Sequence, residues 1–408
     1  MNKPSTLQEN TNVNVHDFRN AFRYKSLKDL RFTYYIFLLL QKPWLVKTLS
    51  AITEWCLRNN IPVQWLIKSS IFKVFCAGEN ISEAIKTIKE LEEYNVTAVL
   101  DYVSEGEKTE AVFNYNCEVI TANIRLLAQK APGNAISVKL SGLEDTVWLE
   151  KINNSVSDTH NKFDQARYEK FITRVDTICK HCFEAGIILY LDAEERSTQD
   201  VFDRVAGQMM QKYNRKKAIV FNTVQMYLTD RLPYIKNLIA EAEILSFNPG
   251  IKLVRGAYVE KERLLAAQEG RISPVHPDKQ STDRAFDQAL RLCLEHSSNV
   301  YTCIASHNEQ SNLLAAELIS RLNIHDHQQK VKFSQLYGMS DNLTFNLAAR
   351  GYSASKYIPY GEVKKAVPYL IRRAEENTSV GGQLSKELIY LEKELQRRKQ
   401  QINSLFHY

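Results

Sequence analysis

Eight short runs of β-branched and apolar residues, separated by helical patterns of ten or more residues, constrain the fold of this chain most. They span residues 97–103, 135–141, 187–192, 218–223, 250–254, 301–305, 331–334 and 352–357. Several are nearly continuous apolar runs, which is typical of parallel strands buried on both faces. Eight strand–helix repeats within about 280 residues predict an α/β protein with a closed (β/α)8 TIM-like barrel.

The competing architecture is a doubly wound open sheet. Such sheets often bind nucleotides through a G-x-G-x-x-G turn or a P-loop, and the sequence contains neither motif. The barrel is therefore the favoured fold.

The segments on either side of the predicted barrel have a different pattern. We expect a flexible tail over 1–15, an N-terminal helical arm over 16–95, the barrel over 96–380 and a C-terminal helix over 381–408. Within the arm, Asn80 stands three residues before Glu83, which is a typical helix start.

Composition excludes several classes of protein. Of 408 residues, 44% are hydrophobic and 25% are charged, as in ordinary globular proteins. The net charge of +6 is dispersed without interleaved aromatic residues, so nucleic-acid binding is not expected. The odd count of seven cysteines favours reduced thiols and a cytoplasmic location. No secretory or transit segment is recognisable, and the longest apolar run, 34–40, is too short to span a bilayer.

Polar side chains occur at or near the end of every predicted strand. In (β/α)8 enzymes the catalytic groups gather at the carboxyl ends of the strands. Each of these residues alone has an ordinary structural explanation, such as a helix N-cap. Their coincidence predicts an active site. The residues are Asp101, Lys139, Asp192, Gln225, Arg255, His307, Gln335 and Tyr357.

The segment 357–377 begins as a strand end and continues as a helix from about Glu362. One helix face is apolar, formed by Val363, Ala366, Val367, Leu370 and Ala374. The other carries Tyr369, Arg372, Arg373 and Glu376. Adjacent arginines suit bidentate capture of a carboxylate or phosphate, but a solvated, salt-bridged surface gives the same pattern.

The predicted site is positively biased, because Lys139, Arg255, Arg372 and Arg373 outnumber the carboxylates of Asp192 and Glu376. An anionic ligand is therefore expected. The sequence has no G-x-S-x-G elbow, and its dispersed histidines lack H-E-x-x-H spacing, so serine-nucleophile chemistry and a metal site fit poorly. The remaining class is chemistry carried out by a cofactor, which the protein binds and orients together with an anion.

Five segments, taken together and in their order along the chain, resemble the proline dehydrogenase family: 191–195, 252–258, 306–308, 335–339 and 369–377. The resemblance covers roughly 95–380. It implies FAD, oxidation of L-proline to Δ1-pyrroline-5-carboxylate by hydride transfer from C5 to flavin N5, and electron transfer to a quinone. No second catalytic domain is recognisable, so a monofunctional enzyme is expected, with a pyrroline-5-carboxylate dehydrogenase as its partner.

The resemblance also implies roles for particular residues. Those expected to bind or position the substrate carboxylate and ring are Lys139, Asp192, Tyr357, Arg372, Arg373 and Glu376, with Asp192 holding Lys139 or Arg373. Those expected to bind the flavin are Gln225, Arg255, Gly256, Ala257, Ser306, His307, Asn308 and Gln335.

Two further expectations follow from the resemblance. Tyr357 favours proline over hydroxyproline, although a hydroxyproline dehydrogenase and a non-catalytic barrel remain alternatives. A membrane quinone implies peripheral membrane contact, either through the aromatic N-terminal region or through the helix at 384–406. For that helix, ordinary packing against the protein is the favoured alternative.

Overall fold

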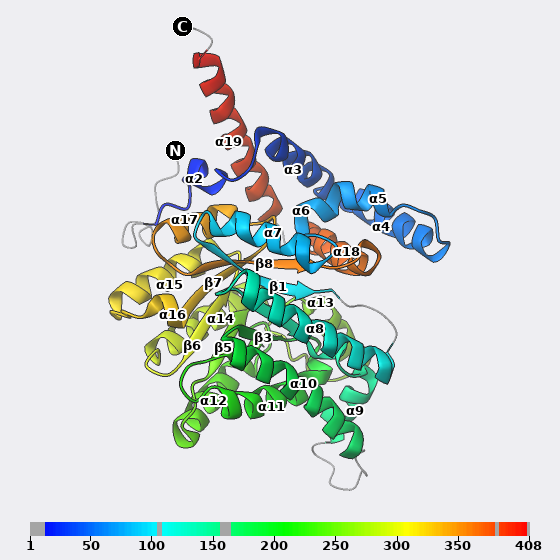
Figure 1. Ribbon diagram of the computed structural model, residues 1–408, viewed down its shortest axis with the longest axis vertical. Helices are drawn as coiled ribbons and strands as arrows, with labels where there is room; N and C mark the ends of the chain where they lie inside the picture. Colours follow the sequence, from blue (N-terminus) through cyan, green and yellow to red (C-terminus); the bar gives the residue numbers. More distant parts are fainter. Residues whose placement is uncertain (1–12, 104–107, 156–164, 380–382, 406–408) are drawn as a thin grey trace. The chain divides into compact units, whose positions relative to one another are not determined.

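The computed structural model describes residues 13–103, 108–155, 165–379 and 383–405. Its eight parallel strands follow the order β1 to β8 in one closed barrel (Figure 1). The predicted barrel is confirmed. The strands are β1 Val96–Tyr102, β2 Ala135–Lys139, β3 Ile188–Asp192, β4 Val220–Gln225, β5 Gly250–Val254, β6 Tyr301–Ala305, β7 Val331–Leu336 and β8 Ala354–Tyr360.

The chain divides into two compact units, one formed by Val99–Ser334 and the other by Met1–Ala98 with Gln335–Tyr408. The helices of the first unit are α8 Glu110–Lys130, η2 Leu140–Gly142, α9 Thr146–Ser155, α10 Gln165–Ala185, α11 Arg196–Tyr213, α12 Arg231–Leu245, α13 Val259–Gln268, α14 Lys279–Glu295, α15 Glu309–Arg321 and α16 His327–Lys330. The predicted domain boundaries do not coincide with this division.

The second unit contains the predicted helical arm and the C-terminal helix. Its helices are α2 Phe18–Ala21, α3 Leu27–Leu40, α4 Pro43–Arg58, α5 Gln64–Ile67, η1 Lys68–Phe72, α6 Lys73–Phe75, α7 Ile81–Glu92, α17 Asp341–Ala349, α18 Val363–Ser379 and α19 Gln383–Leu405. The predicted start of α7 is confirmed, because Asn80 Oδ1 accepts a hydrogen bond from Glu83 N at 3.0 Å. Val13 and Val15 are buried, so the expected flexible tail does not extend to residue 15.

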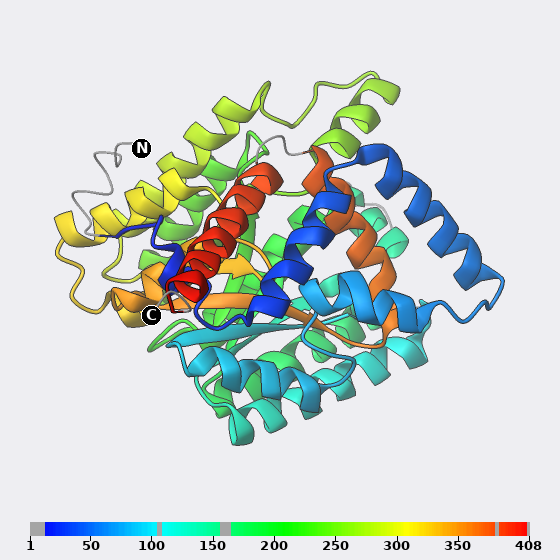
Figure 2. The ribbon, with the colours of Figure 1, turned by 90° about the horizontal axis from the view of Figure 1, so that it is seen from above.

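The core of the second unit is one apolar cluster contributed by segments far apart in the sequence. Phe37 and Phe75 from the N-terminal region pack there with Leu370 of α18 and Leu391 of α19. Figure 2 shows α19, in red, alongside α3, in dark blue. The stripe of α19 is accordingly buried, with Leu384, Leu388 and Leu391 each less than a tenth exposed. Ordinary packing thus accounts for this stripe.

All seven cysteines lie in the protein interior. Cys179 and Cys182 lie buried in α10, and all seven cysteines are free thiols. Burial raises the pKa of both of these thiols. None of the helices among the described residues is both long enough and apolar enough to cross a membrane.

Candidate active site

The ends of β2 and β3 bring two predicted site residues next to each other. Lys139 is paired in register with Asp192. The hydrogen-bond partner of Lys139 is nevertheless Asp101 at the end of β1, with Nζ 2.9 and 3.0 Å from the two carboxylate oxygens. Burial opposes the charge of Lys139, but the carboxylates of Asp101 and Asp192 outweigh it and raise the lysine pKa. Lys139 is therefore an ammonium ion at neutral pH.

Asp192 has a different hydrogen-bonded cation. Lys252 Nζ in β5 lies 2.6 Å from Asp192 Oδ1, and the side chains are 6% and 11% exposed. Asp192 also raises the pKa of Lys139 electrostatically, but the direct contact of Lys139 is with Asp101. The expectation that Asp192 holds Lys139 or Arg373 stays a prediction. Each of the two carboxylates, Asp101 and Asp192, thus holds one lysine.

The loop after β3 is fixed by Glu194 and Gln225. The Glu194 carboxylate accepts hydrogen bonds from Ser141 N at 3.1 Å and Ser141 Oγ at 2.5 Å. Gln225, at the end of β4, is 2% exposed and donates through Nε2 to the Glu194 main-chain oxygen at 2.6 Å. Burial raises the pKa of Glu194 despite the bonds from Ser141. The side-chain amide of Gln225 therefore anchors this loop to the end of β4.

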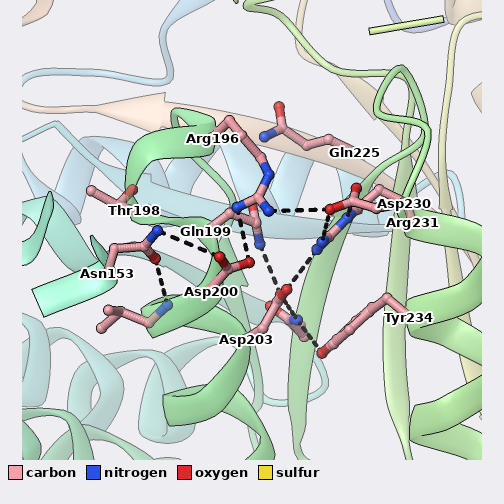
Figure 3. A network of polar contacts seen from close by, with 12 residues as sticks. Asn153, Arg196, Thr198, Gln199, Asp200, Asp203, Gln225, Asp230, Arg231 and Tyr234 are labelled. Carbon is pink, nitrogen blue, oxygen red and sulfur yellow. Dashed lines mark hydrogen bonds and ion pairs between the residues drawn. The ribbon is translucent and has the colours of Figure 1, made fainter. Parts of the chain in front are cut away.

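A polar network beside β4 holds this part of the barrel (Figure 3). Asn222 Nδ2 in β4 donates to Asp203 Oδ1 of α11 at 2.8 Å, and Arg231 Nη1 of α12 reaches Asp203 Oδ2 at 2.5 Å. Arg196, at the start of α11, pairs with Asp200 at 2.8 Å and with Asp230 at 3.2 Å. The network links β4 to α11 and α12, and so fixes the strand that carries Gln225.

Arg255 follows β5 and is held on several sides. Its Nε donates to Asp283 at 2.6 Å, Nη1 to Ser306 Oγ at 2.7 Å, and Nη2 to Ser311 Oγ at 3.0 Å. The guanidinium also lies 4.3 Å from the ring centroid of Phe286. A guanidinium has five N–H groups, so two N–H donors remain beyond these bonds. Arg255 is a fixed cation with donors available to a ligand.

Gly256 has a backbone conformation that other residue types rarely adopt. Its φ is +111°, and a Cβ atom there would lie 1.9 Å from Cδ1 of the buried Tyr227 ring. The chain therefore requires glycine directly after Arg255. Ala257, the next residue, is exposed.

The turn after β6 joins Arg255 to the start of α15. Ser306 Oγ, which accepts from Arg255, also accepts from Asn308 N at 3.1 Å. Asn308 caps α15, its Oδ1 accepting from Ser311 N at 3.1 Å. His307 lies between them and is half-buried. These three predicted residues thus form one turn at a helix N-terminus, where backbone dipoles favour anionic groups.

The remaining predicted residues belong to the second unit. Gln335 is buried within β7, and its Oε1 accepts from Thr344 Oγ1 at 2.8 Å. The expectation that Tyr357 ends the eighth strand is wrong, because β8 continues to Tyr360. Pro359 has no N–H, but its carbonyl accepts from Ala77 N at 2.8 Å, which keeps the segment extended. Tyr357 is a half-buried strand residue.

Helix α18 presents the two arginines as expected, with one correction. The predicted apolar face is confirmed, since Val363, Ala366, Val367, Leu370 and Ala374 are all buried. Tyr369 was assigned to the opposite face, but it is only 7% exposed and belongs to the apolar core. Its ring centroid lies 5.8 Å from Arg373 Cζ, so the aromatic ring supports the half-buried guanidinium. Arg372 is exposed, and the side chain of Glu376 lies outside the described residues.

Comparison with known protein families adds to this geometry. Residues 84–386 match the family described as Proline dehydrogenase. The chain belongs to the proline dehydrogenase family. It is 32% identical over 380 residues to Proline dehydrogenase 1, mitochondrial, of Dictyostelium discoideum, covering 83% of this chain and 66% of that one. It is 38% identical over 242 residues to Proline dehydrogenase 2, mitochondrial, of Arabidopsis thaliana, covering 58% and 50%.

A solved structure shows the same fold. The crystal structure of proline utilization A from Bdellovibrio bacteriovorus, inactivated by N-propargylglycine, matches with a TM-score of 0.71 and 19% identity. The match covers 94% of this chain and 43% of that one. The chain spans about half to two thirds of the length of the two curated relatives described above.

Several residues that hold the predicted site residues were not identified from the sequence. Lys252, Glu194 and Asp283 all hold predicted site residues or their loops. Lys252 carried a usable signal, because a charged residue in the middle of an apolar barrel strand has to face a polar interior. With these partners included, Lys139, Lys252 and Arg255 each have a bonded carboxylate. The expected positive excess, which also counts Arg372 and Arg373, stays a prediction.

Proposed function

We propose that this chain oxidises L-proline to Δ1-pyrroline-5-carboxylate with a bound flavin. The observation that supports this best is the Arg255–Gly256 turn at the end of β5. It combines a fixed guanidinium that has free donors with a backbone position from which a side chain is sterically excluded. Together with family membership, this turn favours a planar, acceptor-rich cofactor over a metal or a nucleophilic serine.

The residues present fit a flavin. The two remaining N–H donors of Arg255 suit the nitrogen and oxygen acceptors of an isoalloxazine ring, and Gly256 allows its backbone to approach closely. The turn Ser306–Asn308 at the start of α15 suits the anionic part of a dinucleotide, which favours FAD. Gln225 and Gln335 are the proposed amide ligands of the ring. When bound, the flavin supplies the acceptor for the hydride from proline C5.

The protein residues bind and orient the substrate in this proposal. Lys139, held as an ammonium by Asp101 and Asp192, binds the proline carboxylate together with Arg372 and Arg373. Fixing a substrate in reactive geometry lowers a barrier by about 7–11 kcal/mol in favourable model systems. We further propose a quinone as electron acceptor and a pyrroline-5-carboxylate dehydrogenase as the partner that consumes the product.

The cytoplasmic location remains a prediction. The seven free thiols agree with a reducing compartment. The two curated relatives described above are named as mitochondrial proteins.

Anaerobic reduction tests the proposed reaction. The purified protein is expected to be yellow, and L-proline is expected to bleach the flavin absorbance in the absence of oxygen. A colourless protein that cannot be reconstituted with FAD would support the non-catalytic barrel instead. Bleaching by trans-4-hydroxyproline in preference to proline would assign the chain to the hydroxyproline alternative.

Arg373→Met is expected to raise KM for proline while flavin stays bound. Losing a charged hydrogen bond to the carboxylate costs about 1.5–3 kcal/mol, which corresponds to roughly a 10- to 150-fold rise in KM. Steady-state kinetics and the flavin-to-protein absorbance ratio measure the two effects. Arg350→Met, at an exposed position of the same unit, is the control. Equal KM values in the two variants would exclude Arg373 as a carboxylate ligand.

Lys139→Met separates a binding role from a structural one. It is expected to raise KM and also to destabilise the fold by about 3–5 kcal/mol, because Asp101 remains buried without its cation. Adding Asp101→Asn is expected to restore stability and leave KM high. Denaturant unfolding and kinetics on both variants provide the measurement. Recovery of KM in the double variant would show that Lys139 serves only to neutralise Asp101.

Tyr357→Ser tests substrate choice. Shortening this half-buried side chain makes room beside the pyrrolidine ring and leaves a hydroxyl group as a hydrogen-bond partner. We expect the ratio of kcat/KM for trans-4-hydroxyproline over proline to rise about tenfold, as for other single pocket contacts. Tyr352→Ser, at another half-buried tyrosine that precedes β8, is the control. An unchanged ratio would remove Tyr357 from the pocket.

A further inference from the structure

One face of helix α14 holds Arg255. Asp283, Phe286 and Asp287 follow one another at i, i+3 and i+4, so they lie on the same side of α14. Asp283 binds the guanidinium directly, because its Oδ1 accepts a hydrogen bond from Arg255 Nε at 2.6 Å. The guanidinium also lies over the buried ring of Phe286, with Cζ 4.3 Å from the ring centroid. The helix thus supplies an anion and an aromatic face to one cation, and Asp287 adds a second anion on the same side.

Asp287 reaches Arg255 through a hydroxyl group of α15, the helix beside α14 in Figure 1. Ser311 Oγ donates to Asp287 Oδ1 at 2.6 Å and accepts from Arg255 Nη2 at 3.0 Å. Ser311 is 1% exposed, so water has little access to either bond. A hydroxyl group that donates to a carboxylate becomes a stronger acceptor, because hydrogen bonds in a chain polarise one another. The negative charge of Asp287 therefore acts on the guanidinium without touching it.

The two carboxylates differ in how many cations they serve. Lys279 Nζ lies 2.6 Å from Asp283 Oδ2, so Asp283 is shared between Lys279 and Arg255. Burial opposes the ionisation of Asp283, but the hydrogen bonds from these two cations outweigh it and lower its pKa. Asp287 forms no ion pair with any described residue, and its bonded partner is the hydroxyl group of Ser311. Asp287 is therefore the carboxylate that changes the charge around Arg255 without breaking an ion pair.

The guanidinium of Arg255 keeps one N–H donor on each terminal nitrogen, since three of its five N–H groups are bonded. The proposed function directs these two donors at the flavin ring. A ring that accepts a hydride gains one negative charge, because a hydride consists of two electrons and one proton. A cation beside the ring stabilises the reduced form more than the oxidised form. The charge around Arg255 therefore affects the reduction potential of the flavin.

We propose that Asp287 is a positioning residue that sets the reduction potential of the flavin through Ser311 and Arg255. Its negative charge weakens the positive field of the guanidinium and so keeps the potential lower than Arg255 alone would make it. A lower potential reduces the driving force for oxidising proline and makes the reduced flavin a stronger donor to its acceptor. Asp287 thus divides the driving force between the two half-reactions. This role rests on the proposed function, which brings the flavin ring to Arg255.

Potentiometric titration of Asp287→Asn tests the proposal. Asparagine accepts the hydrogen bond from Ser311 through Oδ1, so the orientation of Arg255 is kept while the charge is lost. A unit charge acting over roughly 12 Å at an effective dielectric constant of about 20 changes an equilibrium about tenfold. We therefore expect the ratio of reduced to oxidised flavin, at one fixed applied potential, to rise about tenfold in the variant. An unchanged or lower ratio would overturn the proposal.

Glu295→Gln is the matched control, because it removes the same charge from the same helix. Glu295 is exposed and lies eight residues beyond Asp287, which places it about 12 Å further along α14. Solvent and salt screen a charge at that position, so the ratio is expected to change less than about twofold. An equal rise in both variants would show an effect of net charge and would contradict a particular role for Asp287.

A double-mutant cycle tests the path through Ser311. Ser311→Ala removes the hydroxyl group that joins Asp287 to Arg255. Adding Asp287→Asn to that variant is expected to raise the ratio of reduced to oxidised flavin by less than in the wild type, because the two residues no longer share a hydrogen bond. An equal rise in the two backgrounds would show that the charge acts through space, and the role given to Ser311 would be wrong.

A purely structural role for Asp287 gives a different pattern. In that case Asp287→Asn lowers the denaturant midpoint or the flavin-to-protein absorbance ratio, and the flavin that stays bound keeps its wild-type potential. This pattern would also overturn the proposal, because it would show that Asp287 only holds α15 against α14.

Arg255→Met separates a failure of this proposal from a failure of the proposed function. It is expected to lower the reduction potential, because the cation beside the ring is lost. If Arg255→Met shifts the potential and Asp287→Asn does not, the role of Asp287 alone is wrong. If Arg255→Met changes neither flavin content nor potential, the flavin does not lie at Arg255. A wild-type protein that binds no FAD would overturn both.

Discussion

Replacing Gly256 with alanine is expected to lower the free energy of unfolding by about 2–6 kcal/mol and to yield protein with little bound flavin. The added Cβ would lie 1.9 Å from the Tyr227 ring, at a φ of +111° that alanine rarely adopts. Overpacking costs about 1–3 kcal/mol and a strained backbone conformation about 1–3 kcal/mol. Relief of the clash has to move the turn that fixes Arg255.

Gly270→Ala is the matched control for Gly256→Ala. Gly270 also has a positive φ, +65°, but a Cβ there would meet no atom within 4 Å. Its cost is the backbone term alone, about 1–2 kcal/mol. Denaturant unfolding measures both variants, and absorbance measures the flavin. If the two alanines cost the same, the contact with Tyr227 does not constrain the turn. If Gly256→Ala binds flavin normally, the close backbone approach is wrong.

Asp341→Asn is expected to destabilise the fold by about 3–5 kcal/mol, because it leaves the buried Lys356 without its counter-ion. Asp341 is 2% exposed and lies 2.7 Å from Lys356, 3.1 Å from Lys25 and 2.8 Å from the hydroxyl group of Tyr24. These contacts join the N-terminal region to α17 and β8. Asp326→Asn is the control: its side chain is 48% exposed in the pair with Lys330, so the change is expected to cost less than about 1 kcal/mol.

The same ion group predicts how stability changes with pH. Burial opposes ionisation of Asp341, but the ammonium groups of Lys25 and Lys356 outweigh it and lower its pKa to about 2. A carboxyl group with a lowered folded-state pKa stabilises the protein above its unfolded pKa, near 4, and the contribution is lost as pH falls toward 2. Unfolding curves between pH 5 and pH 2 are expected to show a steeper loss in the wild type than in Asp341→Asn. Parallel curves would show that Asp341 does not titrate in this way.

The strand–helix order was predictable because it depends on local periodicity. All eight predicted strands are present, and the apolar face of α18 is buried as expected. Errors arose where a distant segment changed a local preference. The eighth strand was expected to end at residue 357, but β8 continues to Tyr360, and the carbonyl of Pro359 accepts a hydrogen bond from Ala77 N, 282 positions earlier in the sequence. Tyr369 was assigned to the polar face of α18 by its spacing, but its ring packs in the apolar core.

The candidate site was predictable in its residues more than in its contacts. Strand-end position and the family resemblance identified Lys139, Asp192 and Arg255. Their partners Asp101, Lys252 and Asp283 lie 38, 60 and 28 positions away from them, respectively. Nothing in the local sequence ranks one carboxylate above another as a partner, because side-chain distance decides the pairing. The expected positive excess, which also counts Arg372 and Arg373, stays a prediction.

The sequence by itself determined the barrel, its strand order and the polar residues at the strand ends, since hydrophobic period and chain connectivity act over a few neighbouring residues. Only the tertiary structure decided which ions pair and which apolar face stays exposed. Helix α4 shows why: apolar side chains lie both on its buried side and on its exposed side. Packing against the core covered Val46 and Cys56 and left Trp44 and Trp55 in solvent.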